Sequence, residues 1–361
     1  MKHLSFSAIA LIFITTSLSA IAGEKGNAYI SNQDGGVTVV DLETMEATSN
    51  IDIQAKSPRG IAVTADGKYL ITANKDDDNI SVIDRASGAL VKHIPVGKNP
   101  EFIRVYKGLV FVSTEPSSKG GPPPKAGEAI KEDDAEEKLP ALISVVDLKK
   151  GKKVREIVGG PETEGVEFSK DGKKLIITNE ADNTITVHNF ATGKLLKTIS
   201  TKDYGDRPRG IKVSPDGTTY IATLESGNKF MVMDKKFNVT RTVETGQSPY
   251  GVSFDRKGER IFIASSKEKA LQVFDAKTFE KIKDISTGNR CWHFSFTPDD
   301  KQILLACGKS QAVLVIDVDT LEKIKEISDK EMPWGVVTYP KSMGSLDQPD
   351  PQGCRKQDSP T

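Results

Sequence analysis

The strongest constraint on the fold is a pattern of short apolar runs that recurs along the chain. In the stretch Pro58–Gly97, four such runs (IAV, YLITA, ISVI and LVKHIPV) are separated by turn signals at Asp66-Gly67, Asp76–Asn79 and Ser87-Gly88. This spacing is typical of a four-stranded antiparallel meander. The central runs are almost continuously apolar, so both faces of the small sheet must be covered.

Further copies of the same unit can provide that cover. The second and third strands recur along the chain, as in YLITAN and ISVID. A spacing of roughly 40–45 residues, interrupted once, is typical of the four-stranded blades of a β-propeller. The seven copies of the first strand begin with PRG at 58, PEF at 100, TEG at 163, PRG at 208, PYG at 249, CWH at 291 and PWG at 333.

The two ends of the pattern together predict a closed ring. Asn27–Ile53 supplies a second, third and fourth strand with no first strand before them, whereas Pro333–Tyr339 supplies a first strand with none after it. Joining the two completes one blade and removes exposed sheet edges. The predicted fold is therefore all-β: a seven-bladed β-propeller closed by a C-terminal strand that completes the N-terminal blade.

The first 22 residues have the features of a secretory signal peptide. Lys2 is followed by the apolar run Ala8–Ile14 and by an A-x-A site, so cleavage is expected after Ala22. The apolar run is too short to span a bilayer, so no membrane span is expected after cleavage. The expected location is the periplasm, with secretion as the alternative.

Three regions are predicted: a signal peptide over 1–22, the propeller over 23–340 and a polar tail over 341–361. An insertion at 115–140 lies between the second and third strands of the third blade. It is rich in Pro, Gly and acidic residues, which predicts a mobile loop. It could be a lid, a docking arm or a structureless excursion. The formal net charge is zero, which argues against nucleic acid as a partner.

Two cysteines are predicted to lie nearly opposite each other in one hairpin. Cys291 opens the first strand of the last full repeat and Cys307 closes the second strand. An oxidising compartment would permit a disulfide between them if the register allows it. Two free buried thiols are the alternative. Cys354 in the tail is the third cysteine, and it is either free or paired between molecules.

One face of the ring is the expected working face. Because strand direction alternates, the loops before each first strand and the loops between second and third strands lie on the same side, which we call the mouth face. Both chain termini are expected on the opposite side. Each blade places one candidate ligand- or partner-binding residue on this face, and these are Arg59, Glu101, Glu164, Arg209, Tyr250, Trp292 and Trp334. Arg290 and His293 lie next to Trp292 in or near the same strand and are further candidates.

These residue types allow two interpretations. Arg side chains recognise carboxylates, and Trp and Tyr rings stack on flat ligands, which favours a binding site at the mouth. In the alternative, Arg59 or Arg209 pairs with Glu101 or Glu164 across the ring and the aromatic rings pack between blades.

Motifs for catalysis, metal binding and cofactors are not found. The sequence lacks H-x-x-x-H, C-x-x-C and G-x-S-x-G patterns. Glu101 and Glu164 could do acid–base work, and Asp76–Asp78 could hold a cation weakly, but a solvated turn is the simpler interpretation of the latter. No cofactor, metal site or catalytic residue is therefore expected.

The repeat P-x-G-V-x-S-x-D-G-K, followed by a strand ending in N and by S-V-I-D, resembles the YVTN family of β-propeller repeats. Within that family the chain is most similar to periplasmic propellers associated with pyrroloquinoline-quinone-dependent catabolism. The likeness lies in Gly288–Asp299, Pro333–Val337 and Gly344–Asp347. The insertion at 115–140 and the Cys291/Cys307 pair depart from it.

This resemblance implies a non-catalytic companion of a quinoprotein dehydrogenase or cytochrome c system. Such a protein would bind a periplasmic partner, or a small ligand, at the mouth. Two alternatives stay open, because one propeller fold hosts many activities. They are a lactonase-like hydrolase, and a haem-d1-type propeller with His293 as axial ligand.

Overall fold

The computed structural model describes residues 25–116, 139–328 and 331–349. The predicted signal peptide with Ala22, most of the insertion, and Cys354 lie outside the described residues.

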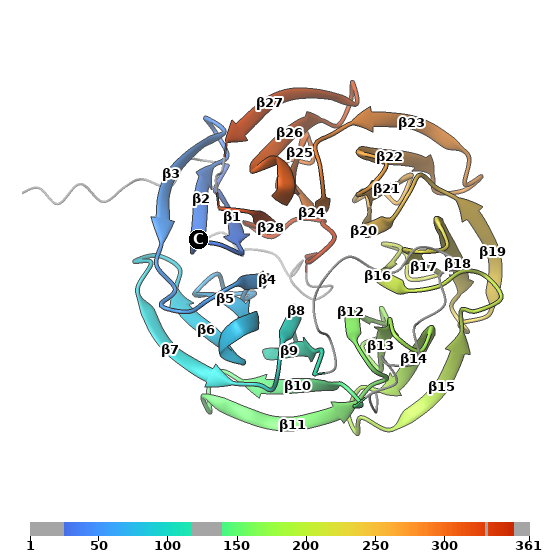
Figure 1. Ribbon diagram of the computed structural model, residues 1–361, viewed down its shortest axis with the longest axis horizontal. Helices are drawn as coiled ribbons and strands as arrows, with labels where there is room; N and C mark the ends of the chain where they lie inside the picture. Colours follow the sequence, from blue (N-terminus) through green and yellow to red (C-terminus); the bar gives the residue numbers. More distant parts are fainter. Residues whose placement is uncertain (1–24, 117–138, 329–330, 350–361) are drawn as a thin grey trace, which may run out of the picture.

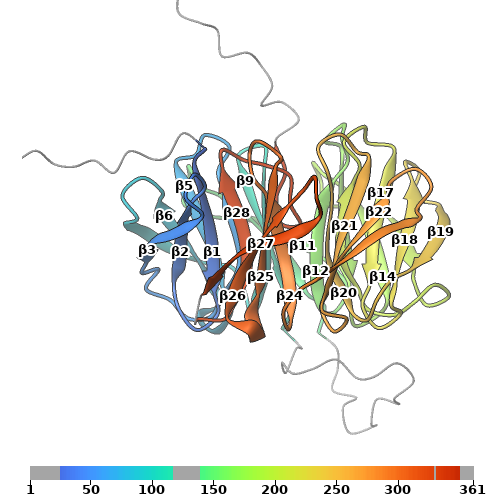
Figure 2. The same cartoon turned by 90° about the horizontal axis from the view of Figure 1, so that it is seen from above.

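The described chain forms seven four-stranded antiparallel sheets arranged in a ring (Figure 1). Figure 2 shows the same ring from the side as a disk. This confirms the predicted seven-bladed β-propeller. The strands of blades 1 to 4 are β1 (Asn27–Asn32), β2 (Val37–Asp41), β3 (Glu46–Ile51), β4 (Pro58–Val63), β5 (Tyr69–Asn74), β6 (Asn79–Asp84), β7 (Leu90–Pro95), β8 (Pro100–Tyr106), β9 (Leu109–Thr114), β10 (Leu142–Asp147), β11 (Lys152–Val158), β12 (Thr163–Phe168), β13 (Lys174–Asn179), β14 (Thr184–Asn189) and β15 (Leu195–Ser200).

Blades 5 to 7 follow the same order, and the last strand returns to blade 1. Two short 3-10 helices follow second strands, η1 (Lys75–Asp77) and η3 (Gly308–Ser310). The remaining strands are β16 (Pro208–Val213), β17 (Thr219–Leu224), β18 (Lys229–Asp234), β19 (Val239–Glu244), β20 (Pro249–Phe254), β21 (Arg260–Ser265), β22 (Ala270–Asp275), β23 (Lys281–Ser286), β24 (Cys291–Phe296), β25 (Gln302–Cys307), β26 (Ala312–Asp317), β27 (Glu322–Ser328) and β28 (Pro333–Tyr339).

The ring closes through the pairing of β28 with β1. The sheet order in blade 1 is β28-β1-β2-β3, and Tyr29 lies opposite Val337 in an antiparallel register. The strand nearest the channel in blade 1 therefore comes from the C-terminal end of the chain. This agrees with the closure expected from the incomplete first repeat.

The burial of the strands follows the apolar pattern of each repeat. The first three strands of every blade are almost entirely buried, whereas the fourth strand lies on the rim and alternates. In β7 only Ile94 is buried, and in β23 only Ile285. Most outer strands thus bury one side chain against their own blade and leave the others partly or fully exposed, and β19 buries none.

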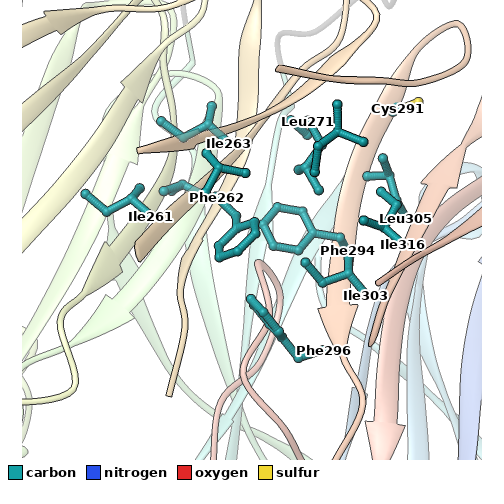
Figure 3. Packing of buried hydrophobic residues seen from close by; sticks show 14 of the residues in the cluster. Ile261, Phe262, Ile263, Leu271, Cys291, Phe294, Phe296, Ile303, Leu305 and Ile316 are labelled. Carbon is teal, nitrogen blue, oxygen red and sulfur yellow. The ribbon is translucent and has the colours of Figure 1, made fainter. Parts of the chain in front are cut away.

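Neighbouring blades pack face to face through large apolar side chains. Between blades 6 and 7, Phe262 and Phe294 meet in the cluster of Figure 3. The rings of Phe262 and Phe296 lie 5.1 Å apart with nearly perpendicular planes, which is a favourable edge-to-face arrangement. Such contacts supply the cover that a single twisted sheet lacks.

Glycine in the first strands allows the blades to approach closely at the channel. A Cβ at Gly60 would lie 2.6 Å from the carbonyl oxygen of Glu101, and one at Gly210 would lie 2.5 Å from that of Tyr250. Both oxygens belong to the next blade in the ring. The third residue of the first strand must therefore be small wherever the neighbouring backbone is this near.

Cys291 and Cys307 form a disulfide in blade 7. The two residues are directly opposite in the β24–β25 register, and their Cα atoms lie 3.8 Å apart. The bond joins the start of β24 to the end of β25, both at the mouth face.

After its last strand the described chain folds back into the ring. After β28 the chain turns back at Pro340 and residues 341–349 run into the channel (Figure 1). Gly344 forms an isolated antiparallel bridge with Ser295, and the backbone of Ser345 donates to Phe294 (2.9 Å). The inner edge of β24 is the hydrogen-bonding surface that holds this segment in the channel.

Within the described residues, the structure has no helix long and apolar enough to cross a membrane.

The two C-terminal elements predict different effects of truncation. Ending the chain after Met332 removes β28, so we expect the ring to stay open and cooperative unfolding to be lost. Ending it after Pro340 keeps β28 and removes the channel segment 341–349 with the residues that follow it, so we expect a folded ring that unfolds at lower urea concentration. Urea unfolding followed by circular dichroism compares both with the full chain. Equal stability of all three proteins would contradict the closure.

Candidate functional site

The charged residues among the seven first-strand mouth positions pair with one another, Arg59 with Glu101 and Arg209 with Glu164. All seven occupy the second position of a first strand, which places them at the mouth end of the channel. Arg59 of blade 2 forms an ion pair with Glu101 of blade 3, and its Nε donates to Gln33 (3.0 Å). Glu101 is 1% exposed. This part of the site therefore agrees with the alternative in which Arg and Glu side chains of neighbouring blades pair with each other.

Arg209 is the centre of a larger network. Its Nε donates to Glu225 (2.8 Å), and its Nη1 forms an ion pair with Glu164. The same Nη1 lies 2.5 Å from Glu180 and 3.2 Å from the Tyr250 hydroxyl. Tyr250 in turn donates to Glu164 (2.7 Å). One guanidinium of blade 5 thus connects blades 4 and 6.

Three carboxylates of the mouth were missed by the sequence analysis. Glu115, Glu180 and Glu225 each follow the second strand of their blade, in blades 3, 4 and 5. All three are buried, and Glu180 pairs with Arg207. The sequence has a glutamate at the same repeat position in three consecutive blades, and this regularity could have identified these residues as part of the mouth. The candidate positions were chosen at the start of the first strands, whereas these glutamates directly follow the second strands.

Three of the mouth carboxylates are close enough to be considered as metal ligands. Glu115, Glu164 and Glu180 each offer an oxygen within 4.8 Å of the other two. Arg209 contacts two of the three, so its guanidinium already supplies positive charge to the group. The simplest account of the cluster is a buried ion-pair network.

Burial changes the protonation of the site. It raises the pKa of Glu115 to about 8, with a further contribution from the charge of Glu101. It also raises the pKa of Tyr250. Glu115 is therefore a neutral acid at pH 7, which reduces the repulsion among the mouth carboxylates.

The aromatic residues of the mouth lie inside the ring. Trp334 is 2% exposed and Trp292 is 9% exposed. The ring of His293 lies 4.3 Å from that of Trp334 and 5.3 Å from that of Tyr250. Arg290 is only partly buried and remains open to solvent. These aromatic rings pack between blades and present little surface to a ligand.

His293 contacts the C-terminal segment. Its Nδ1 lies 3.1 Å from the Ser345 hydroxyl. Burial lowers the pKa of His293 to about 3, with further contributions from the charges of Arg209 and Lys212. The imidazole is therefore neutral, and Ser345 occupies the channel beside it.

This arrangement does not fit a haem. The Nε2 of His293 has no hydrogen-bond partner among the described residues, so a ligand atom is free. However, Ser345 and Leu346 fill the channel next to the ring and are themselves buried. An axial role for His293 would require the tail to leave the channel.

A second buried charge cluster lies deeper in the channel. Arg104 donates to Glu167 (3.1 Å), and Lys212 donates to the backbone carbonyl of Asp347 (3.1 Å). Lys341 pairs with the Asp347 carboxylate (3.1 Å). Burial, together with the charge of Arg104, lowers the pKa of Lys212 to about 7. The tail is thus held by charges as well as by backbone bonds.

Asp76–Asp78 is a hydrogen-bonded turn. Asp76 accepts from the Ser57 hydroxyl, Asp77 from the Lys56 amide (2.7 Å) and Asp78 from the Asn99 amide (2.9 Å). These carboxylates connect the loops before β4 and β8 to the end of β5.

Comparisons with known proteins agree with the geometry at the level of the fold. Residues 140–269 match the family described as the cytochrome D1 heme domain, and residues 19–104 match the seven-bladed β-propeller lactonase family. The chain is a β-propeller protein. Each match covers less than half of it.

One curated relative and several solved structures are similar to this propeller. An uncharacterized WD repeat-containing protein of Synechocystis is 26% identical over 60% of this chain, and the match spans 56% of that relative. The propeller is similar to Kuenenia stuttgartiensis hydrazine synthase, with a TM-score of 0.69 and 20% identity, and the match covers 87% of this chain and 99% of the hydrazine synthase chain. It is also similar to a putative 6-phosphogluconolactonase from Bacteroides uniformis, with a TM-score of 0.70 and 16% identity, and the match covers 87% of this chain and 100% of the other chain.

The raised pKa of Glu115 predicts how stability depends on pH. An ordinary Glu ionises near pH 4.5, whereas folded Glu115 stays protonated to about pH 8. Between these values the folded state binds more protons, so this residue makes the free energy of unfolding fall as pH rises. Glu115→Gln should remove this part of the fall. Urea unfolding at pH 5 to 8 measures it.

The matched control is Glu244→Gln, which changes an exposed carboxylate on an outer strand. We expect its pH profile to run parallel to that of the unaltered protein. If the Glu115→Gln profile is parallel as well, Glu115 does not carry the extra proton.

Proposed function

We propose that this chain is a periplasmic, non-catalytic propeller that binds a partner protein through its mouth face. The partner is a member of a quinoprotein dehydrogenase and cytochrome c oxidation system. The sequence resemblance and the signal-peptide pattern of residues 1–22 support the location and the type of partner.

The mouth and the channel leave little room for a small reactant. Arg59 and Arg209 are engaged with buried carboxylates, and residues 341–349 fill the channel below them. A reactant would find neither a free nucleophile–base pair nor a deep pocket among these groups. The surface that remains is formed by the loops of the mouth face, which suits a large partner.

The proposal predicts direct and saturable binding to one protein of the oxidation system. The mature protein, residues 23–361, is immobilised and titrated with a purified quinoprotein alcohol dehydrogenase and, separately, with its c-type cytochrome. Binding should weaken with added salt because the exposed loops are rich in charge. Absence of binding to both proteins at micromolar concentrations would remove the support for this partner class.

A lactonase-like hydrolase is the second candidate. It is favoured by the match of residues 19–104 to the lactonase family and by the neutral Glu115, which could act as a general acid. Hydrolysis of 6-phosphogluconolactone would then be detected by acid release. It should fall by about 10²–10⁴-fold in Glu115→Gln and stay unchanged in Glu244→Gln. No release above the uncatalysed rate would leave only the binding role.

A further inference from the structure

A hollow on the mouth face between blades 6 and 7 concentrates positive charge. Its volume is about 380 Å³, and three loops line it, those between β21 and β22, before β24, and between β25 and β26. Four of the six lining side chains are cations and none is a carboxylate. The lining residues are Ser266, Lys267, Lys269, Asn289, Arg290 and Lys309.

The three loops are fixed to one another. The Cys291–Cys307 disulfide joins the residue after Arg290 to the strand that precedes Lys309. The Gly308 amide donates to the Arg290 carbonyl (3.0 Å), and the Thr287 amide donates to that of Lys269 (2.8 Å). The cations are therefore presented on a preorganised framework, which lowers the entropy lost on binding.

Most charged side chains of the hollow have no ion-pair partner in the described part of the chain. Among the described residues, no ion pair within 4.0 Å involves Lys267, Lys269 or Lys309. Ser266 is 2% exposed, and its hydroxyl has no hydrogen-bond partner in the described structure. A buried hydroxyl beside unpaired cations points to an acceptor supplied from outside.

The positive charge of this hollow does not reflect a general excess of basic residues. The protein as a whole has a formal net charge of zero. A second hollow on the same face, between blades 1 and 2, has a volume of about 580 Å³ and is lined by Asp34, Asp52 and Asp76, with Lys56 as the single cation. The two hollows of the mouth face therefore carry opposite charge.

We infer that the basic hollow docks a carboxylate-rich surface segment of a partner protein. This rests on the proposed function and names the chemistry of that partner. Nucleic acid fits less well because a phosphate backbone needs a continuous line of cations, and the acidic hollow on the same face would repel it. Arg290 can hold a carboxylate through two parallel hydrogen bonds, and the lysines add attraction at longer range.

The test uses a fluorescein-labelled hexaglutamate peptide as the probe and follows its anisotropy with the full-length mature protein. We expect binding that weakens as NaCl rises from 20 to about 150 mM. Lys267→Glu/Lys309→Glu should weaken it at least tenfold. The control is Lys235→Glu/Lys277→Glu, which makes the same charge change in exposed turns on the opposite face and should alter the affinity less than twofold.

Thermal unfolding of both variants establishes that the ring is intact. Equal losses in the two variants, or no peptide binding by the unaltered protein, would overturn the docking site. Titration of the same variants with the dehydrogenase and the cytochrome separates the two proposals. If a partner binds the unaltered protein and the Lys267→Glu/Lys309→Glu variant equally, the partner role stands and this hollow is not its site.

Discussion

The rest of the structure depends on the pairing of β28 with β1. Each blade has a central pair of strands that is apolar on both faces, so a blade is stable only between two others. A row of such blades would leave its end blades uncovered, whereas a ring leaves none. Because the two ends of the chain share one sheet, the ring is closed by main-chain hydrogen bonds and by the packing of Val336 and Val337.

Ring closure brings the seven first strands together at the axis, and this explains the chemistry of the mouth. Charged residues at the second position of β4, β8, β12 and β16 are too crowded to remain solvated, and they pair with one another. A buried pair adds little net stability over an apolar contact, but removing one partner is costly. Arg209 therefore fixes blade 4 against blade 5, and the same contacts keep its guanidinium from a ligand.

The repeat made the fold predictable, and it also limited what could be predicted of the site. Aligning first strands placed Arg59 and Glu101 at the same level of the channel, where they do pair. Glu115 was not found because it comes from a different repeat position and meets them only through the curvature of the ring. The tail has no repeat partner at all. Its polar composition gave no sign that part of it lies in the channel, where polar groups such as His293 line the wall and can bury a polar segment.

Because residues 341–349 lie in the channel, the loops of the mouth face are more accessible to an external molecule than the axis is. In an open propeller the axis is the natural place for a small ligand, because one residue from every blade converges there. Here Ser345 and Asp347 occupy that space and make the hydrogen bonds and ion pairs that a ligand would make. Any external molecule then meets the loops first, and these differ in charge around the ring. The proposed partner would meet a filled channel and two hollows of opposite charge, which favours binding in one orientation.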